Sequence, residues 1–134
     1  MDIRLELVIL PVTDVDAARA FYERAGFNTD HDHTVSDDVR FVQMTPPGSY
    51  CSIAFGRGLT DAEPGSVKGL QVVVDDINEA KAHFDAAGIE SGDVKELAWG
   101  DFLGFVDPDG NTWTVQSMAR IKRMQPSAEA TSAI

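Results

Sequence analysis

The chain repeats itself at one constant offset, and this repeat limits its possible folds more than any other feature of the sequence. At an offset of 62 positions, residues 12–26 align with residues 74–88 without a gap, and the turn at 46–49 aligns with the turn at 108–111. An offset shared by a helical pattern and a distant turn indicates two copies of one supersecondary unit. We therefore expect two tandem modules that are built in the same way.

Each module shows the pattern of a βαβββ unit. A short aliphatic run comes first, and an apolar helical stripe follows, which begins near Thr13 in the first module and at Asp76 in the second. Gly26 and Gly88 stand where helices commonly end in a left-handed residue. Three strand candidates complete each unit, and a Pro-x-Gly turn typical of a hairpin joins the last two. The expected strands span residues 5–12, 27–32, 39–45 and 50–55, and then 69–74, 89–94, 102–107 and 112–117.

The pattern predicts an α+β fold with a single domain. The modules span residues 7–58 and 69–120, and a polar linker joins them, so that residues 1–120 form the domain. A chain of 134 residues buries enough surface to be stable without disulfide bonds. The segment 121–134 is weakly patterned, and we expect a flexible tail there.

Composition narrows the classes of function. The 22 acidic residues outnumber the 11 lysines and arginines, and the net charge of −11 would repel nucleic-acid phosphates and anionic lipid. The single cysteine, Cys51, cannot form an internal disulfide bond or a thiolate zinc cluster. The first apolar run is typical of a strand and not of a signal peptide, and no run is long enough for a membrane span. We expect a cytoplasmic protein that binds neither nucleic acid nor membranes.

Two motifs resemble a known superfamily. They are AARAFYERAGF at residues 17–27 and DPDGNTW at residues 107–113. Together they resemble the vicinal oxygen chelate superfamily, which includes glyoxalase I, extradiol dioxygenases and bleomycin-resistance proteins, and residues 42–53 are similar to its bacterial glyoxalase-like subgroup. The resemblance covers residues 3–118 and implies that the two modules form a cupped mixed β-sheet. Membership of such a superfamily does not by itself define an activity.

The resemblance also implies where a divalent metal would bind. In enzymes of this superfamily the ligands are a His or Gln on the first strand of each module and a Glu or His on the last strand. The corresponding positions here are Leu7 and Gly69 on the first strands, and Ser52 and Thr114 on the last strands. Catalytic metals take carboxylate or imidazole ligands, so these residues predict no metal and no other cofactor in the cup.

The segment Asp30-His31-Asp32-His33 is the other cluster with ligand chemistry. Two histidines at positions i and i+2 share one face of a strand, and a metal could use both. The alternative is an exposed strand end that leads into a polar loop, and we adopt this interpretation because such residues mostly lie at the surface.

Strand alternation predicts which side chains line the cup. If Leu7 and Thr114 mark the cavity face, residues two positions away share that face, and pairing across the hairpins adds Gln43 and Phe105. Trp99 precedes a strand and could either stack on a planar ligand or anchor the core. The predicted ligand-binding residues are Leu7, Ile9, Gln43, Tyr50, Ser52, Gln71, Trp99, Phe102, Phe105, Thr112, Thr114 and Gln116.

Two classes of function fit such a cup. An apolar surface with scattered neutral polar groups suits a neutral or aromatic organic ligand, as in a metal-independent binding protein that sequesters a drug or metabolite. The alternative is a metal-free isomerase, cyclase or lyase that acts on a natural-product intermediate, with its acid or base among Asp38, Arg40, Glu96 and Asp101. In both cases unpaired sheet edges, and the association of modules usual in the superfamily, predict a homodimer.

Overall fold

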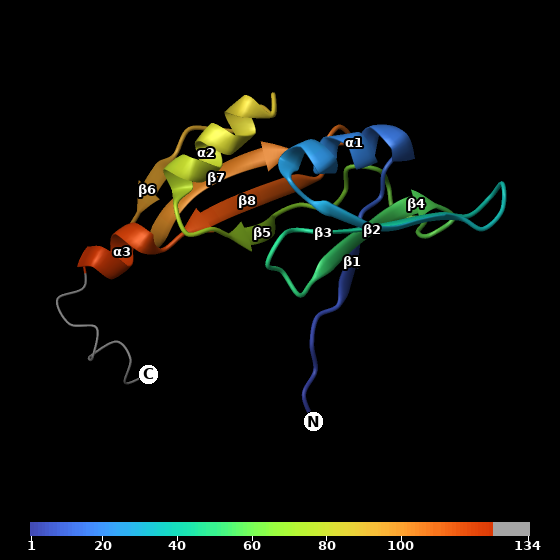
Figure 1. The fold of residues 1–134 in the computed structure, drawn as a ribbon, viewed down its shortest axis with the longest axis horizontal. Coiled ribbons are helices and arrows are strands. Elements are labelled where there is room, and N and C mark those ends of the chain that lie inside the picture. The colour runs from blue at the N-terminus through green and yellow to red at the C-terminus, as the bar shows by residue number, and fades with distance from the viewer. Residues whose placement is uncertain (125–134) are drawn as a thin grey trace.

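The structure is a computed structural model that describes residues 1–124, and it contains both expected modules (Figure 1). The first module consists of β1 (Leu7–Ile9), α1 (Val15–Ala25), β2 (Asn28–Thr34), β3 (Arg40–Thr45) and β4 (Ser52–Arg57). The second consists of β5 (Leu70–Val73), α2 (Ile77–Ala86), β6 (Lys95–Leu97), β7 (Gly100–Val106) and β8 (Thr112–Ser117), and a short helix, α3 (Ala119–Met124), follows it.

Each module forms one four-stranded mixed sheet. The strand orders are β1-β4-β3-β2 and β5-β8-β7-β6, so the two sheets have the same topology. The first strand of each module pairs in parallel with the last strand, and all other neighbours are antiparallel. The α+β fold of two tandem βαβββ modules is therefore confirmed.

The two long helices begin and end close to the predicted residues. Asp76 caps α2 as expected, whereas Asp14, and not Thr13, caps α1. Each aspartate accepts hydrogen bonds from backbone N–H groups of the first turn, which have no partner within the helix. Gly26 has a φ of 103° and Gly88 has a φ of 72°, so both helices end at a left-handed glycine as predicted.

Two segments differ from the prediction because tertiary contacts decide their structure. The strand expected at 89–94 is wrong: Ile89 is buried in the core, Ser91 forms an isolated bridge to Phe105, and β6 begins later, at Lys95. The expected tail begins within α3, where Arg120 donates a 2.7 Å hydrogen bond to a buried carboxylate of β7. Residues 125–134 lie outside the described part of the chain.

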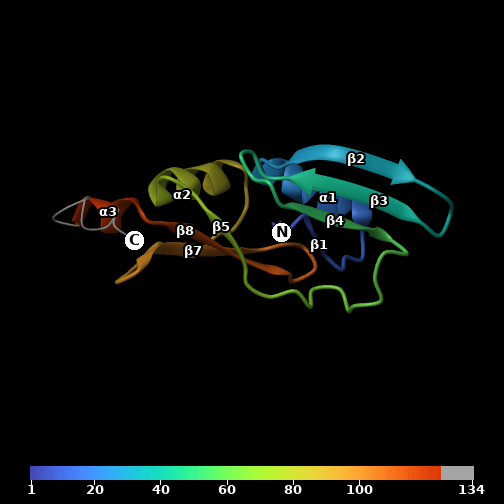
Figure 2. The same cartoon turned by 90° about the horizontal axis from the view of Figure 1, so that it is seen from below.

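Both α1 and α2 cover the same side of the two sheets and leave the other side without a helix (Figures 1 and 2). One hydrophobic cluster lies under the helices and contains residues of both modules. Phe21 and Phe27, from the first module, lie near Phe105 and Trp113, from the second, with ring centroids 6.1 Å and 5.5 Å apart. The modules therefore share a core. None of the helices in residues 1–124 is long and apolar enough to cross a membrane.

The buried carboxylate of Asp107, in the turn between β7 and β8, connects the two modules. It accepts hydrogen bonds from the Tyr22 hydroxyl of α1 at 2.7 Å and from the Asn111 side chain at 2.9 Å. The backbone N–H groups of Asp109 and Asn111 supply two further donors, and Trp113 donates to Tyr22 at 3.0 Å. Burial is the main cause that raises the pKa of the Tyr22 hydroxyl, and the negative charge of Asp107 is the second. The hydroxyl therefore stays protonated and donates its hydrogen bond.

The linker between the modules is held against the same turn. Gly65 has a φ of 79°, and a Cβ atom there would lie 2.0 Å from the carbonyl oxygen of Asp109. The Asn111 side chain donates to the Pro11 carbonyl at 3.1 Å and accepts from the Val67 N–H at 3.1 Å. One buried amide thus ties the linker to the segment between β1 and α1, which helps to fix the modules relative to each other.

We expect Tyr22→Phe to lower the free energy of unfolding by about 1–3 kcal/mol, because Asp107 loses a donor and the Trp113 N–H loses its acceptor. Tyr50→Phe is the matched control, since Tyr50 is 96% exposed, and its effect should stay within about 0.5 kcal/mol. Urea denaturation measures both values. Equal stability of the two variants would show that the Tyr22 hydroxyl does not help to hold the modules together.

Candidate functional site

The side of the sheets that no helix of residues 1–124 covers is called here the open face. In the first module, Leu7 lies opposite Ser52, and Ile9 and Gln43 both lie opposite Ala54, so these five side chains share one face. Their neighbours on the strands point to the helices and are largely buried. In the second module the open face consists of Gln71, Val73, Phe102, Gly104, Val106, Thr112, Thr114 and Gln116.

A chain of hydroxyl groups lies on the open face of the first module. Ser52 Oγ lies 2.6 Å from Thr45 Oγ1, and Thr45 donates in turn to the carboxylate of Asp30. Because Thr45 uses its proton for Asp30, it accepts the proton of Ser52. The Gln43 amide donates to Ser52 at 3.5 Å, and its oxygen has no partner within residues 1–124. Gln43 thus presents an acceptor to the open face.

Amide groups form a similar chain on the open face of the second module. Gln71 Nε2 donates to Gln116 Oε1 at 2.6 Å, and Gln116 Nε2 donates to the backbone carbonyl of Trp99 at 3.2 Å. The Trp99 side chain is 62% exposed, so it is not the core anchor that the sequence left as an alternative. The turn that carries this exposed aromatic residue is thus bonded through its backbone to an amide of the open face.

Phe105 does not lie on the open face, and the prediction that it lines the cup is wrong. It lies opposite Trp113 on the helix-covered side, where the two rings stack with centroids 5.7 Å apart. Its ring also contacts Phe84 of α2, with centroids 4.8 Å apart. Phe102 and Phe105 are three positions apart, and a regular strand cannot place both on one face. Of the two, Phe102 takes the open face.

The other predicted residues lie on or next to the open face. Tyr50 and Trp99 lie in the segments before β4 and β7, and both are exposed. Sequence reasoning missed Phe41 and Val106, although alternation from Gln43 and Phe102 would have found them. Contact with a ligand stays a prediction for all of these residues. Those that lie on the open face are Leu7, Ile9, Gln43, Ser52, Gln71, Phe102, Thr112, Thr114 and Gln116.

One of the four predicted metal-ligand positions is wrong, as the pairing of the strands shows. Leu7 lies opposite Ser52, and the residue opposite Thr114 in the second module is Gln71, not Gly69. The connection from the first strand to the helix is two residues shorter in the second module than in the first. The constant offset that relates the helices therefore does not extend to the first strands, which is why counting along the repeat gave Gly69.

The four positions do not fit the divalent metal that the superfamily implies. Leu7 has no ligand atom, and Ser52 and Thr114 offer only neutral hydroxyls. Gln71 is of a type that the superfamily uses on this strand, and it is the one such residue among the four. One glutamine oxygen does not hold a divalent metal by itself, because such sites typically take three protein ligands with carboxylate or imidazole groups among them. In the part of the chain that the structure describes, no group of three or more His, Cys, Asp or Glu residues is arranged to hold a metal ion.

His31 and His33 lie on β2, the edge strand of the first sheet, and they border the open face. His31 lies opposite Gln43 and His33 lies opposite Phe41. Their rings are stacked, with centroids 5.8 Å apart, and both side chains are exposed. The interpretation of this segment as an exposed strand end holds for Asp30, His31 and His33 but not for Asp32, which is partly buried in ion pairs with Arg19 and Arg40. Binding of an added metal by the two imidazoles is untested.

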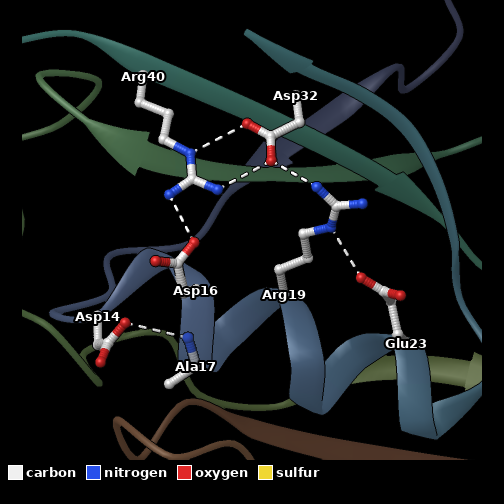
Figure 3. Close-up of polar contacts among 7 residues, drawn as sticks. All are labelled: Asp14, Asp16, Ala17, Arg19, Glu23, Asp32 and Arg40. Carbon is white, nitrogen blue, oxygen red and sulfur yellow. Dashed lines mark hydrogen bonds and ion pairs between the residues drawn. The ribbon is translucent and has the colours of Figure 1, made fainter. Parts of the chain in front are cut away.

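Two of the residues considered as an acid or base are held in ion pairs away from the open face. Arg40 points to the helix-covered side, where it donates two hydrogen bonds to Asp32 and one to Asp16 (Figure 3). Asp101 is buried and accepts a hydrogen bond from Arg120 at 2.7 Å. Neither Arg40 nor Asp101 is therefore placed to act on a ligand at the open face.

We expect Asp32 to make the stability of the fold depend on acid. The guanidinium of Arg40, and to a lesser extent that of Arg19, lowers the pKa of Asp32 to about 2 (Figure 3). An aspartate in an unfolded chain has a pKa of about 3.9. A pKa that is lowered by folding stabilises the folded state above the unfolded value, and this stabilisation is lost as the pH falls from about 4 through about 2.

Asp32→Asn should lower stability at neutral pH and flatten the loss of stability between about pH 4 and pH 2.5. Asp93→Asn is the control, since Asp93 is exposed and forms no ion pair with the described residues. Urea denaturation at several pH values measures the difference. Parallel pH profiles for Asp32→Asn and the parent protein would contradict the assignment.

Comparison with known proteins identifies the family. Residues 4–115 match the model of the Glyoxalase/Bleomycin resistance protein/Dioxygenase superfamily. Because this match covers most of the chain, the protein belongs to that superfamily, as the two sequence motifs indicated.

Solved structures of the superfamily have the same fold. TnmS3, an antibiotic binding protein from Streptomyces sp. CB03234, is 29% identical, with a TM-score of 0.78 over 87% of this chain and 96% of that chain. A glyoxalase/bleomycin resistance protein from the same Streptomyces strain is 30% identical, with a TM-score of 0.75 over 85% of this chain and 100% of that chain.

A sequence relative is also similar over most of its length. The uncharacterized protein YetH of Bacillus subtilis (strain 168) is 22% identical over 112 residues, which are 81% of this chain and 93% of YetH.

Proposed function

We propose that the protein binds a neutral or aromatic organic molecule at the open face, without a metal ion, and sequesters it unchanged. The chemistry of the open face carries this proposal, because apolar side chains such as Ile9, Phe102 and Val106 alternate there with neutral amides and hydroxyls. Small-molecule sites typically combine an apolar lining with a few placed polar groups. The antibiotic-binding protein TnmS3, at 29% identity, supports the same class of function.

The polar groups of the open face favour binding because they are already ordered. Ser52 and Gln116 are fixed by hydrogen bonds to their neighbours, so little side-chain entropy is lost when a ligand arrives. The amide oxygens of Gln43 and Gln71 then offer two acceptors in fixed positions. A planar ligand with hydroxyl or N–H groups on an apolar skeleton would satisfy both the acceptors and the apolar surface.

The proposal includes a homodimer that completes the cup. Ile9, Tyr50, Val73 and Trp99 expose large apolar surfaces on or beside the open face. A second copy of the chain that packed on the open face would remove these side chains from water. A ligand held between two such faces would be buried on both sides.

We expect sedimentation at micromolar concentration to give twice the chain mass of 14.5 kDa. The physical reason is the apolar area of the open face, which association removes from water. A single species of 14.5 kDa across that range would contradict the homodimer.

Adjacent residues on β8 allow a matched test of the open face. Thr114→Glu places a carboxylate on the open face, where water can reach it, and should lower ligand binding at least about tenfold with a small change in melting temperature. Val115→Glu places the same group in the fully buried core under the helices and should unfold the protein, because an unpaired buried charge costs several kcal/mol.

The measurements are thermal melts and the fluorescence of N-phenyl-1-naphthylamine, a neutral aromatic probe, with and without EDTA. Binding that survives EDTA supports a site without metal. Equally severe destabilisation by both variants would show that Thr114 lies in a filled core. Native mass spectrometry of the purified protein then separates the two hypotheses, because an unchanged co-purified ligand supports sequestration and a converted one supports an enzyme.

A further inference from the structure

We propose that the chain has a second small-molecule site, selective for organic cations, in a groove between the modules. This inter-module groove lies on the helix-covered side at the free edge of β5 and has a volume of about 360 Å³. The first module contributes the end of α1 and the turn between β3 and β4, and the second contributes β5 and α2 (Figures 1 and 2). The site is separate from the open face, so it goes beyond the proposed function.

The walls of the inter-module groove are apolar and come from both modules. Phe27 and Pro46 stand on the side of the first module, and Val74, Ala80 and Phe84 stand on the side of the second. Proline and aromatic rings are stiff, so these walls lose little freedom when a flat molecule enters. Aromatic rings also attract cations through the negative potential of their faces.

The charges that line the inter-module groove are acidic. Asp75, Asp76 and Glu79 are its only Asp, Glu, Lys or Arg residues among those described. Asp76 is occupied as the cap of α2. The carboxylates of Asp75 and Glu79, in contrast, form no ion pair or side-chain hydrogen bond within residues 1–124. Two uncompensated negative charges thus lie beside apolar walls, where a cation would find both a counter-charge and a hydrophobic surface.

The width of the inter-module groove is set before any ligand binds. His83 of α2 lies with its Nε2 2.8 Å from the carbonyl oxygen of Ala25, the last residue of α1. This contact joins the two helices at one end of the groove. The next residue, Gly26, leaves room for the imidazole, since a Cβ atom there would lie 3.2 Å from His83 Nε2. The groove is therefore a preformed site, which lowers the entropic cost of binding.

Three probes that share one ring system test the charge preference: 1-naphthylmethylammonium, 1-naphthylmethanol and 1-naphthoate. Calorimetric titration of the full chain should show the ammonium binding at least about tenfold more tightly than the alcohol, and the naphthoate more weakly than both. Binding of the ammonium should weaken in about 0.5 M salt, because the carboxylates are near the surface. Equal affinity for the three probes would overturn the proposal.

Variants locate the site. Asp75→Asn and Glu79→Gln should each weaken binding of the ammonium about fivefold. The matched control is Glu63→Gln, which removes an exposed carboxylate of the linker and should have no effect. Ala80→Leu should fill the groove and reduce binding of all probes, and thermal melts show whether each variant is folded. An effect of Glu79→Gln no larger than that of the control would overturn the proposal.

The open-face variant keeps the two sites distinguishable. Thr114→Glu should weaken binding of N-phenyl-1-naphthylamine at least about tenfold and leave the affinity for 1-naphthylmethylammonium unchanged. If Thr114→Glu strengthens or abolishes binding of the ammonium, the cation binds at the open face, and the inter-module groove is not its site. Failure of the neutral probe alone would contradict the proposed function without affecting this inference.

Discussion

The carboxylate of Asp107 is the interaction on which the arrangement of the whole molecule depends. A buried charge is tolerated only when hydrogen bonds compensate it, and this one has four donors. Three of the donors belong to its own turn and fix the shape of that turn, while the fourth, the Tyr22 hydroxyl, belongs to the other module. Because the position of the second sheet relative to α1 follows from this contact, the geometry of the open face and of the inter-module groove follows from it too.

Binding without a metal ion, as proposed for the open face, changes where binding energy can come from. An enzyme of this superfamily with a metal would hold its substrate by coordination, whereas in the proposed binding protein the apolar area removed from water would have to supply most of the affinity, at roughly 25 cal/mol per Å². One sheet face covers only one side of a flat molecule. The proposed homodimer and the proposed aromatic ligand therefore depend on each other physically, because a second face would about double the apolar contact.

The sequence predicted the features that local signals determine. The repeat, both helices, the left-handed Gly26 and Gly88, and the hairpins are encoded within a few residues, and all of them occur in the structure. The errors concern contacts between distant segments. The repeat assigned the metal position of β5 to Gly69 instead of Gln71, because the loop between the first strand and the helix differs in length between the modules. Phe105 was predicted on the wrong face, because its face depends on the register of β7 with β8. Likewise, α3 depends on an ion pair between Arg120 and the buried Asp101, which no local pattern of α3 reveals.

The acidic residues of the chain have two different physical roles. Asp32 lies between two guanidinium groups and joins α1 to the first sheet, so its charge contributes to the fold. Asp75 and Glu79 have no such partners among the described residues. The dipole of α2 favours acids near its start and accounts for Asp76 and in part for Glu79. It does not account for Asp75, which precedes the cap, or for the apolar wall that the other module places opposite these carboxylates. A site for an organic cation explains both features together.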